Sequence, residues 1–143
     1  MIYLDTSALI KRFVVEKGSE LVKPLFHRAP PIATSKIAYP EAYAGLTRKH
    51  REGSLPRRDY EEICRQFELD WHSYVRVDLR DDVLSLTRDL IKRHALRGFD
   101  AIHLASAVGL AEALGERVRF VAADKRLLHA AEREKLDTLD VQG

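Results

Sequence analysis

The sequence predicts an α/β fold in which a mostly parallel central sheet of four to five strands is flanked by helices. Short apolar runs alternate along the chain with longer segments of helical periodicity, and strands that are joined through helices form right-handed crossovers and parallel sheets. The first of these runs is apolar throughout, as in a strand covered on both faces. The 143 residues, of which 45% are apolar, suit one sizeable core, so we expect a single domain over residues 1–143.

In the N-terminal part, turn and breaker residues separate the predicted elements. Gly18 interrupts the first helical pattern, and Pro30 with Pro31 ends the second. Pro40 and Glu41 suit the first turn of a later helix, where proline is tolerated and an acid complements the helix dipole. The predicted elements are a strand at 2–4, helical segments at 8–14 and 19–26, a strand at 32–34 and a helix from about 40 to 52.

The C-terminal part contains a helix of a different kind, at residues 100–114. Its residues are apolar nearly all round, with many alanines, which predicts a central buried helix. His103 lies one turn into it, and we expect that histidine to have a hydrogen-bonded role in the core. The other predicted elements are an amphipathic helix from 56 to about 74, a strand at 74–77, a helix at 81–96, a strand at 118–123, a helix at 125–135 and a short strand at 136–141.

Four carboxylates stand where strands end or helices begin. In an open parallel sheet these places belong to one rim, at the carboxyl ends of the strands, where such folds bind ligands. Carboxylates gathered there repel one another unless a positive group lies among them. A hard cation such as Mg²⁺ or Mn²⁺ fits oxygen ligands, whereas zinc prefers histidine or cysteine, which show no ligand spacing here. The four acids are Asp5, Glu41, Asp100 and Asp124.

Each acid could instead have a purely structural role rather than bind a cation. Aspartate is a common helix N-cap and glutamate in a first turn complements the helix dipole, each at about 1 kcal/mol. Caps can equally be serine, threonine or asparagine, so the use of a carboxylate at all four positions favours a site. Asp78 also ends a predicted strand, but it belongs to an acid-rich run before a helix, and we interpret it as a cap.

Four segments carry a resemblance to a known family. They are Leu4-Asp5-Thr6-Ser7-Ala8-Leu9, Pro40-Glu41, Gly98-Phe99-Asp100-Ala101-Ile102-His103-Leu104-Ala105 and Phe120-Val121-Ala122-Ala123-Asp124-Lys125. In order and spacing they resemble a PIN domain, and more narrowly the VapC-type toxins of bacterial and archaeal toxin–antitoxin pairs. The resemblance spans nearly the whole chain. It implies a parallel sheet flanked by helices, a Mg²⁺- or Mn²⁺-dependent ribonuclease site, a homodimer and inhibition by a cognate VapB-type antitoxin.

The resemblance also assigns residues. Asp5, Glu41, Asp100 and Asp124 match the four acidic, metal-binding and catalytic positions of the family. Thr6 or Ser7 matches the hydroxyl that follows the first acid, and the sequence leaves open which of the two faces the site. Many relatives have threonine two residues before the last acid, where this chain has Ala122. A hydrogen bond that positions Asp124 is therefore missing or supplied by Thr6 or Ser7.

The resemblance implies an endoribonuclease that hydrolyses RNA phosphodiester bonds with a metal-activated water, leaving 5′-phosphate and 3′-hydroxyl ends. We expect single-stranded or loop RNA as the substrate. Lys36, Arg97 and Lys125 flank the acidic segments and are our candidates for contacts to the RNA backbone. The sequence shows no secretion signal or membrane-spanning run, so we expect a cytoplasmic protein.

Three other interpretations are weaker. A phosphoaspartyl receiver would use a strand-end aspartate such as Asp78, but it usually has an acid pair near its first strand. A nucleotide-binding Rossmann domain would need a glycine-rich turn after that strand, which is missing. The third alternative is a non-catalytic PIN-like module that binds RNA or protein. All four acids are present, which counts against this module, and negligible metal binding would revive it.

Overall fold

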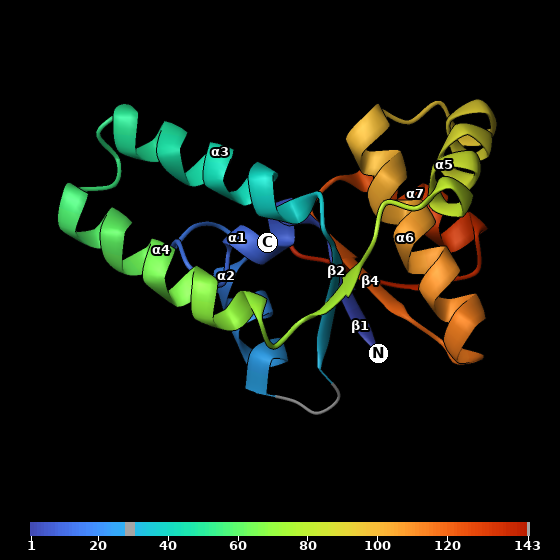
Figure 1. The fold of residues 1–143 in the computed structure, drawn as a ribbon, viewed down its shortest axis with the longest axis horizontal. Coiled ribbons are helices and arrows are strands. Elements are labelled where there is room, and N and C mark those ends of the chain that lie inside the picture. Colours follow the sequence, from blue (N-terminus) through green and yellow to red (C-terminus); the bar gives the residue numbers. More distant parts are fainter. Residues whose placement is uncertain (28–30, 143) are drawn as a thin grey trace.

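A sheet of five strands, in the order β3-β2-β1-β4-β5, divides the molecule (Figure 1). The computed structural model describes residues 1–27 and 31–142. Every pair of neighbouring strands is parallel, which confirms the predicted fold class. The strands are β1 (Ile2–Leu4), β2 (Ile32–Ser35), β3 (Val75–Val77), β4 (Arg119–Ala122) and β5 (Asp137–Asp140).

Helices cover both faces of this sheet (Figure 1). On one face lie α1 (Thr6–Ile10), α2 (Ser19–Val22), the 3₁₀ helix η1 (Lys23–His27), α3 (Ala38–Arg51) and α4 (Arg57–Trp71). On the other lie α5 (Asp81–His94), α6 (Gly98–Leu114) and α7 (Lys125–Arg133). Among the described residues, no helix is both long and apolar enough to cross a membrane.

The central strand β1 explains why the sheet needs two helical layers. Successive side chains of a strand point to opposite faces. Ile2 and Leu4 pack into the core under α1 to α4, whereas Tyr3 packs into the core under α5 to α7. All three side chains are buried. The continuous apolar run at the start of the chain is therefore that of a strand covered on both sides.

The early helices differ from the prediction. The first helix ends at Ile10, and the second segment is divided between α2 and the 3₁₀ helix η1, which contains Pro24. Because Pro24 has no amide N–H to donate to the Glu20 carbonyl, the α-helical hydrogen bonding is interrupted and α2 ends at Val22. The predicted stop at Pro30 lies outside the described residues.

The interpretation of Asp78 as a helix cap is wrong. The N-cap position of α5 is Arg80. Asp78 instead forms an ion pair with Lys36, with 2.5 Å between Oδ1 and Nζ. Both residues follow strands that pair with each other, β3 and β2, which is why two positions so far apart in the sequence meet.

The buried helix α6 forms as predicted but begins two residues earlier, at Gly98. Asp100 therefore lies in its first turn, with Arg97 at the N-cap position. The helix ends at Leu114, and its C-cap is Gly115, whose φ of 64° is in the left-handed region that glycine adopts at low cost. Because α6 is packed against the sheet and α5, the acid at its N-terminus is held at a defined place.

Candidate active site

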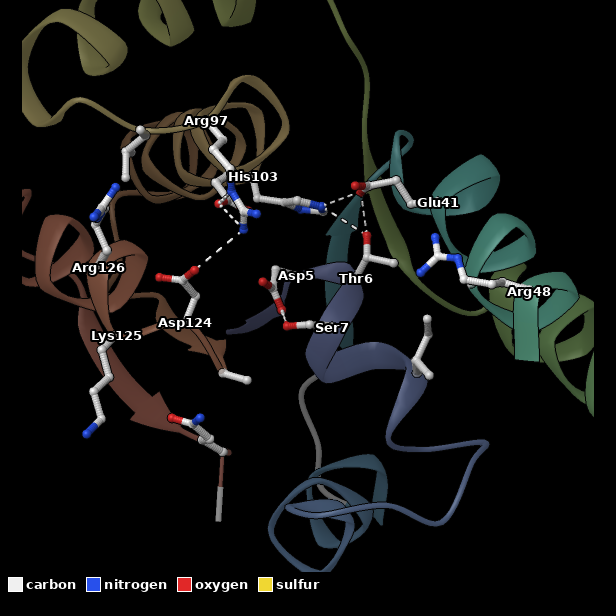
Figure 2. A pocket seen from close by; sticks show the side chains of 16 residues that line it. Asp5, Thr6, Ser7, Glu41, Arg48, Arg97, His103, Asp124, Lys125 and Arg126 are labelled. Carbon is white, nitrogen blue, oxygen red and sulfur yellow. Dashed lines mark hydrogen bonds and ion pairs between the residues drawn. The ribbon is translucent and has the colours of Figure 1, made fainter. Parts of the chain in front are cut away.

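The carboxyl ends of β1 and β4 carry two of the four acids. These strands pair directly, and the Asp5 amide continues their ladder by donating to the Val121 carbonyl at 3.1 Å. Asp124 follows β4 by two residues. Glu41 enters from the first turn of α3 and Asp100 from the first turn of α6. The structure brings all four to one cavity of about 900 Å³ (Figure 2).

Asp5 is the most buried of these acids, with 4% of the residue exposed. It is the N-cap of α1, and its Oδ1 accepts from the Ala8 amide at 2.9 Å and from the Ser7 hydroxyl at 2.8 Å. Burial raises the pKa of Asp5, and this outweighs the lowering by His103, Ala8 and Ser7. The structure thus holds Asp5 rigidly while disfavouring its charge.

Arg97 contacts both Asp100 and Asp124, and Figure 2 shows its side chain directed toward Asp124. Its Nε donates to Asp100 Oδ2 at 3.0 Å, and a terminal nitrogen lies 3.5 Å from Asp124 Oδ2. Asp124 is the N-cap of α7 and accepts from the Leu127 amide at 3.1 Å through its other oxygen. The hydrogen bond to Asp100 and the charges of both acids raise the pKa of Arg97. Arg97 is therefore a cation placed among the carboxylates.

A hydrogen-bonded network holds Glu41. Its Oε1 accepts from the Thr6 hydroxyl at 2.6 Å and lies 2.9 Å from His103 Nε2, while His103 Nδ1 lies 2.8 Å from the Tyr3 hydroxyl. The two nitrogens of the His103 ring thus link Tyr3 to Glu41. Burial raises the pKa of Glu41, but the bonds from His103 and Thr6 prevail and lower it. His103 has the predicted hydrogen-bonded core role, and it also positions an acid of the site.

Both hydroxyls after the first acid face the cavity, which the sequence left open. Thr6 contacts Glu41, whereas Ser7 contacts Asp5. Within the described residues, neither donates to Asp124, so they do not replace a hydroxyl at Ala122. That alanine is buried in the core under α5 to α7. Asp124 is instead held by its own helix and by Arg97.

The basic candidates divide into two groups. Arg97 and Lys125 line the cavity, whereas Lys36 lies outside its lining and is paired with Asp78. Sequence reasoning missed Tyr3 and Gln142. Gln142 lines the cavity from the C-terminal end. Tyr3 supports His103, and strand alternation could have found it, because the extended backbone of β1 continues through Asp5 and puts residues 3 and 5 on the same face.

The donor chemistry of the cavity fits a hard divalent cation. The acids and hydroxyls offer oxygen, which Mg²⁺ and Mn²⁺ prefer. Across residues 1–27 and 31–142, no group of three acidic, histidine or cysteine residues is arranged to hold one ion. The Arg97 guanidinium pairs with both Asp100 and Asp124. Binding of a cation would therefore require Arg97 to leave the carboxylates.

Comparison with protein families gives one match that spans nearly the whole chain. The model described as "PIN domain" matches residues 2–133. Ribonuclease VapC45 of Mycobacterium tuberculosis (strain CDC 1551 / Oshkosh) is 35% identical to this chain over 129 residues, which are 90% of this chain and 87% of that protein.

Solved structures share the fold. The crystal structure of PAE2754 from Pyrobaculum aerophilum aligns with a TM-score of 0.66 and 23% identity, over 99% of this chain and 90% of that one. VapBC2 from Rickettsia felis, solved bound to a DNA fragment from its promoter, aligns with a TM-score of 0.63 and 15% identity, over 98% of each chain. At these identities the likeness concerns the fold.

Proposed function

The chain belongs to the PIN-domain family, and from this membership we propose that it is a Mg²⁺- or Mn²⁺-dependent endoribonuclease, the toxin of a type II toxin–antitoxin pair. The observation that carries the proposal is the convergence of four carboxylates, from four separate segments, on one cavity with basic residues in its lining. The name Ribonuclease VapC of the 35% identical relative supports the same activity.

Asp5, Asp100 and Asp124 would hold the cation, with Glu41 in the same cavity. When bound, such an ion supplies a water of lowered pKa and positive charge for the phosphate. The helix caps at Asp5 and Asp124 leave one oxygen of each carboxylate free of a backbone bond while fixing its direction. This arrangement orients ligands in advance, and that lowers the cost of ordering them on binding.

The other residues of the site stabilise or neutralise the negative charges of the acids. Thr6 and His103 keep Glu41 ionised by hydrogen bonding to its carboxylate. The Arg97 side chain is 77% exposed, so it has room to turn from the acids toward a phosphate oxygen when a cation replaces it. In this proposal Arg97 neutralises the metal-free site and binds substrate in the loaded one.

We also propose the partners of the active protein. They are an RNA substrate cleaved in single-stranded or loop regions, a cognate VapB-type antitoxin, and a second copy of the chain in a homodimer. The VapC name of the relative and the VapBC composition of a structural neighbour support the antitoxin. The cationic residues beside the acids support RNA.

Cleavage of pooled cellular RNA by the purified chain tests the proposal. With Mg²⁺ or Mn²⁺ we expect fragments with 5′-phosphate ends, and we expect none with a chelator or in Asp100→Asn. Asp78→Asn is the matched control, because it removes the same charge from a strand end whose carboxylate lies outside the cavity lining. It should cleave as the natural sequence does.

Titration calorimetry of Mn²⁺ binding gives a second test of the proposal. Arg97→Gln should bind Mn²⁺ more tightly than the natural sequence in the absence of RNA, because the competing cation is gone. Metal-independent cleavage, or equal activity of Asp100→Asn and Asp78→Asn, would overturn the mechanism. Absence of both cleavage and metal binding would indicate a non-catalytic module.

A further inference from the structure

A second groove, of about 540 Å³, lies beside the carboxylate cavity, and both are lined by Lys125 and Arg126. It runs between the C-terminal end of α5 and α7. Among the residues that the structure describes, every ionisable side chain lining this groove is basic. They are Arg93, His94, Lys125, Arg126, His129 and Arg133.

Three of these cations are free to bind an anion. Lys125, Arg126 and Arg133 are exposed, and within the described part of the chain none has a carboxylate within ion-pair distance. Some exposed arginines elsewhere do, such as Arg65 with Glu62 at 2.5 Å. At the groove edge, Arg93 is held by Glu134 at 2.7 and 2.8 Å. The groove thus combines one anchored arginine with unpaired cations.

The basic side chains follow the axis of α7. Lys125, His129 and Arg133 are spaced by four residues, so they lie along one face of the helix. Eight residues of α-helix span about 12 Å. Phosphates of one strand of a duplex recur about every 3.4 Å along its axis, so this row is long enough for more than one phosphate. The smaller lining residues, Ala95 and Ala130, keep the space above it open.

We infer that this groove binds the backbone of the RNA strand on one side of the cleaved phosphate. The inference rests on the proposed function and adds a path for the strand. Figure 2 shows Arg48 on the opposite side of the carboxylates from Lys125 and Arg126, so a strand crossing the acids meets cations on both sides. A backbone with charges at regular intervals matches a row of basic side chains that continues out of the catalytic cavity.

Binding of a labelled, mixed-sequence single-stranded RNA, measured by fluorescence anisotropy in chelator, tests the groove without cleavage. The double variant Arg126→Gln/Arg133→Gln should bind roughly tenfold more weakly, and the slope of log affinity against log salt should fall by about 0.7 for each phosphate that is no longer neutralised. Arg51→Gln/Arg58→Gln is the control. It removes the same charge from exposed positions of α3 and α4 and should bind like the natural sequence.

Cleavage kinetics separate this inference from the proposed function. The groove variant should raise KM for pooled RNA, because the substitutions weaken binding of the substrate. Unchanged affinity, slope and KM in a protein that still cleaves would overturn the groove alone. A natural sequence that neither binds nor cleaves RNA would overturn both. Unchanged RNA binding together with weakened binding of labelled polyglutamate would assign the groove to an acidic protein instead.

Discussion

At the scale of single residues, Asp5 meets two opposed physical demands. Its Oδ1 caps α1 and accepts two hydrogen bonds, which stabilise the fold. Its burial, with Asp100 nearby, disfavours the negative charge that a cation site needs. The free energy of the metal-free fold and the function of the site therefore favour different protonation states of the same carboxyl group.

This conflict predicts the behaviour of Asp5→Asn. Because the folded pKa of Asp5 is raised, its contribution to stability is present below the unfolded pKa and lost as pH rises through the folded pKa. The amide keeps the cap without the charge. Metal-free Asp5→Asn should thus melt a few degrees above the natural sequence at neutral pH, and the gain should shrink toward about pH 4.

Thermal unfolding followed by circular dichroism, across that pH range and in chelator, measures the effect. Asp78→Asn is the control, for which we do not expect a rise in melting temperature. Lys36 lowers the pKa of Asp78, so that carboxylate adds stability above its unfolded pKa, and its removal should leave the melting temperature at neutral pH equal or lower. A lower melting temperature for Asp5→Asn than for the natural sequence would contradict the prediction.

At the scale of elements, the end of α7 carries a strained backbone. Lys135 has a φ of 68°, in the left-handed region, where a side chain costs about 1–2 kcal/mol. It closes the helix by donating its amide to the Glu132 carbonyl at 2.9 Å. Glycine adopts this conformation at low cost and keeps the amide. The turn that leads from α7 into β5 is therefore less stable with lysine at position 135 than it would be with glycine.

We expect Lys135→Gly to raise the free energy of unfolding by about 1 kcal/mol. Relief of the backbone strain stabilises the folded state, and the greater conformational freedom of glycine in the unfolded chain offsets part of that gain. Denaturant unfolding measures it. Gln66→Gly, in the exposed middle of α4, is the matched comparison and should lose about 1 kcal/mol. Equal destabilisation by the two substitutions would show that Lys135 is not strained.

At the scale of the whole molecule, α5 exposes an apolar stripe. Leu84 is 46% exposed and Ile91 is 36% exposed, and positions seven apart lie two turns apart on one helix face. Exposed apolar patches mark sites of association, and most oligomers formed by one chain are symmetric dimers. This stripe is the surface on which we expect the proposed homodimer to form.

Light scattering coupled to gel filtration checks this expectation. The natural sequence should have twice the 16.4 kDa mass of the chain, and Leu84→Lys/Ile91→Lys should have the monomer mass with unchanged circular dichroism. Leu69→Lys, at a residue that is 73% exposed on α4, should stay dimeric. A dimer that persists in the α5 variant would place the interface elsewhere, and a monomeric natural sequence would exclude the homodimer under these conditions.

The fold class and the gathering of the four acids could be predicted from the sequence alone. Strands that alternate with helices form a parallel sheet, and the carboxyl ends of parallel strands meet at one edge. Asp5 and Asp124 follow strands that turned out to be neighbours, so their meeting needed no knowledge of side chains. Likewise, residues 100–114 are apolar on nearly all sides of the helix they form, which was enough to predict a buried helix.

The pairing of side chains within the site could not be predicted without the three-dimensional structure. Thr6 faces Glu41 and Ser7 faces Asp5, Arg97 bridges two acids, and Lys36 is paired outside the cavity lining. Each of these contacts depends on distances of a few ångströms between segments that the fold brings together, and sequence periodicity specifies a face but not such distances. For that reason the chemistry of the rim was predictable, whereas the charge balance within it was not.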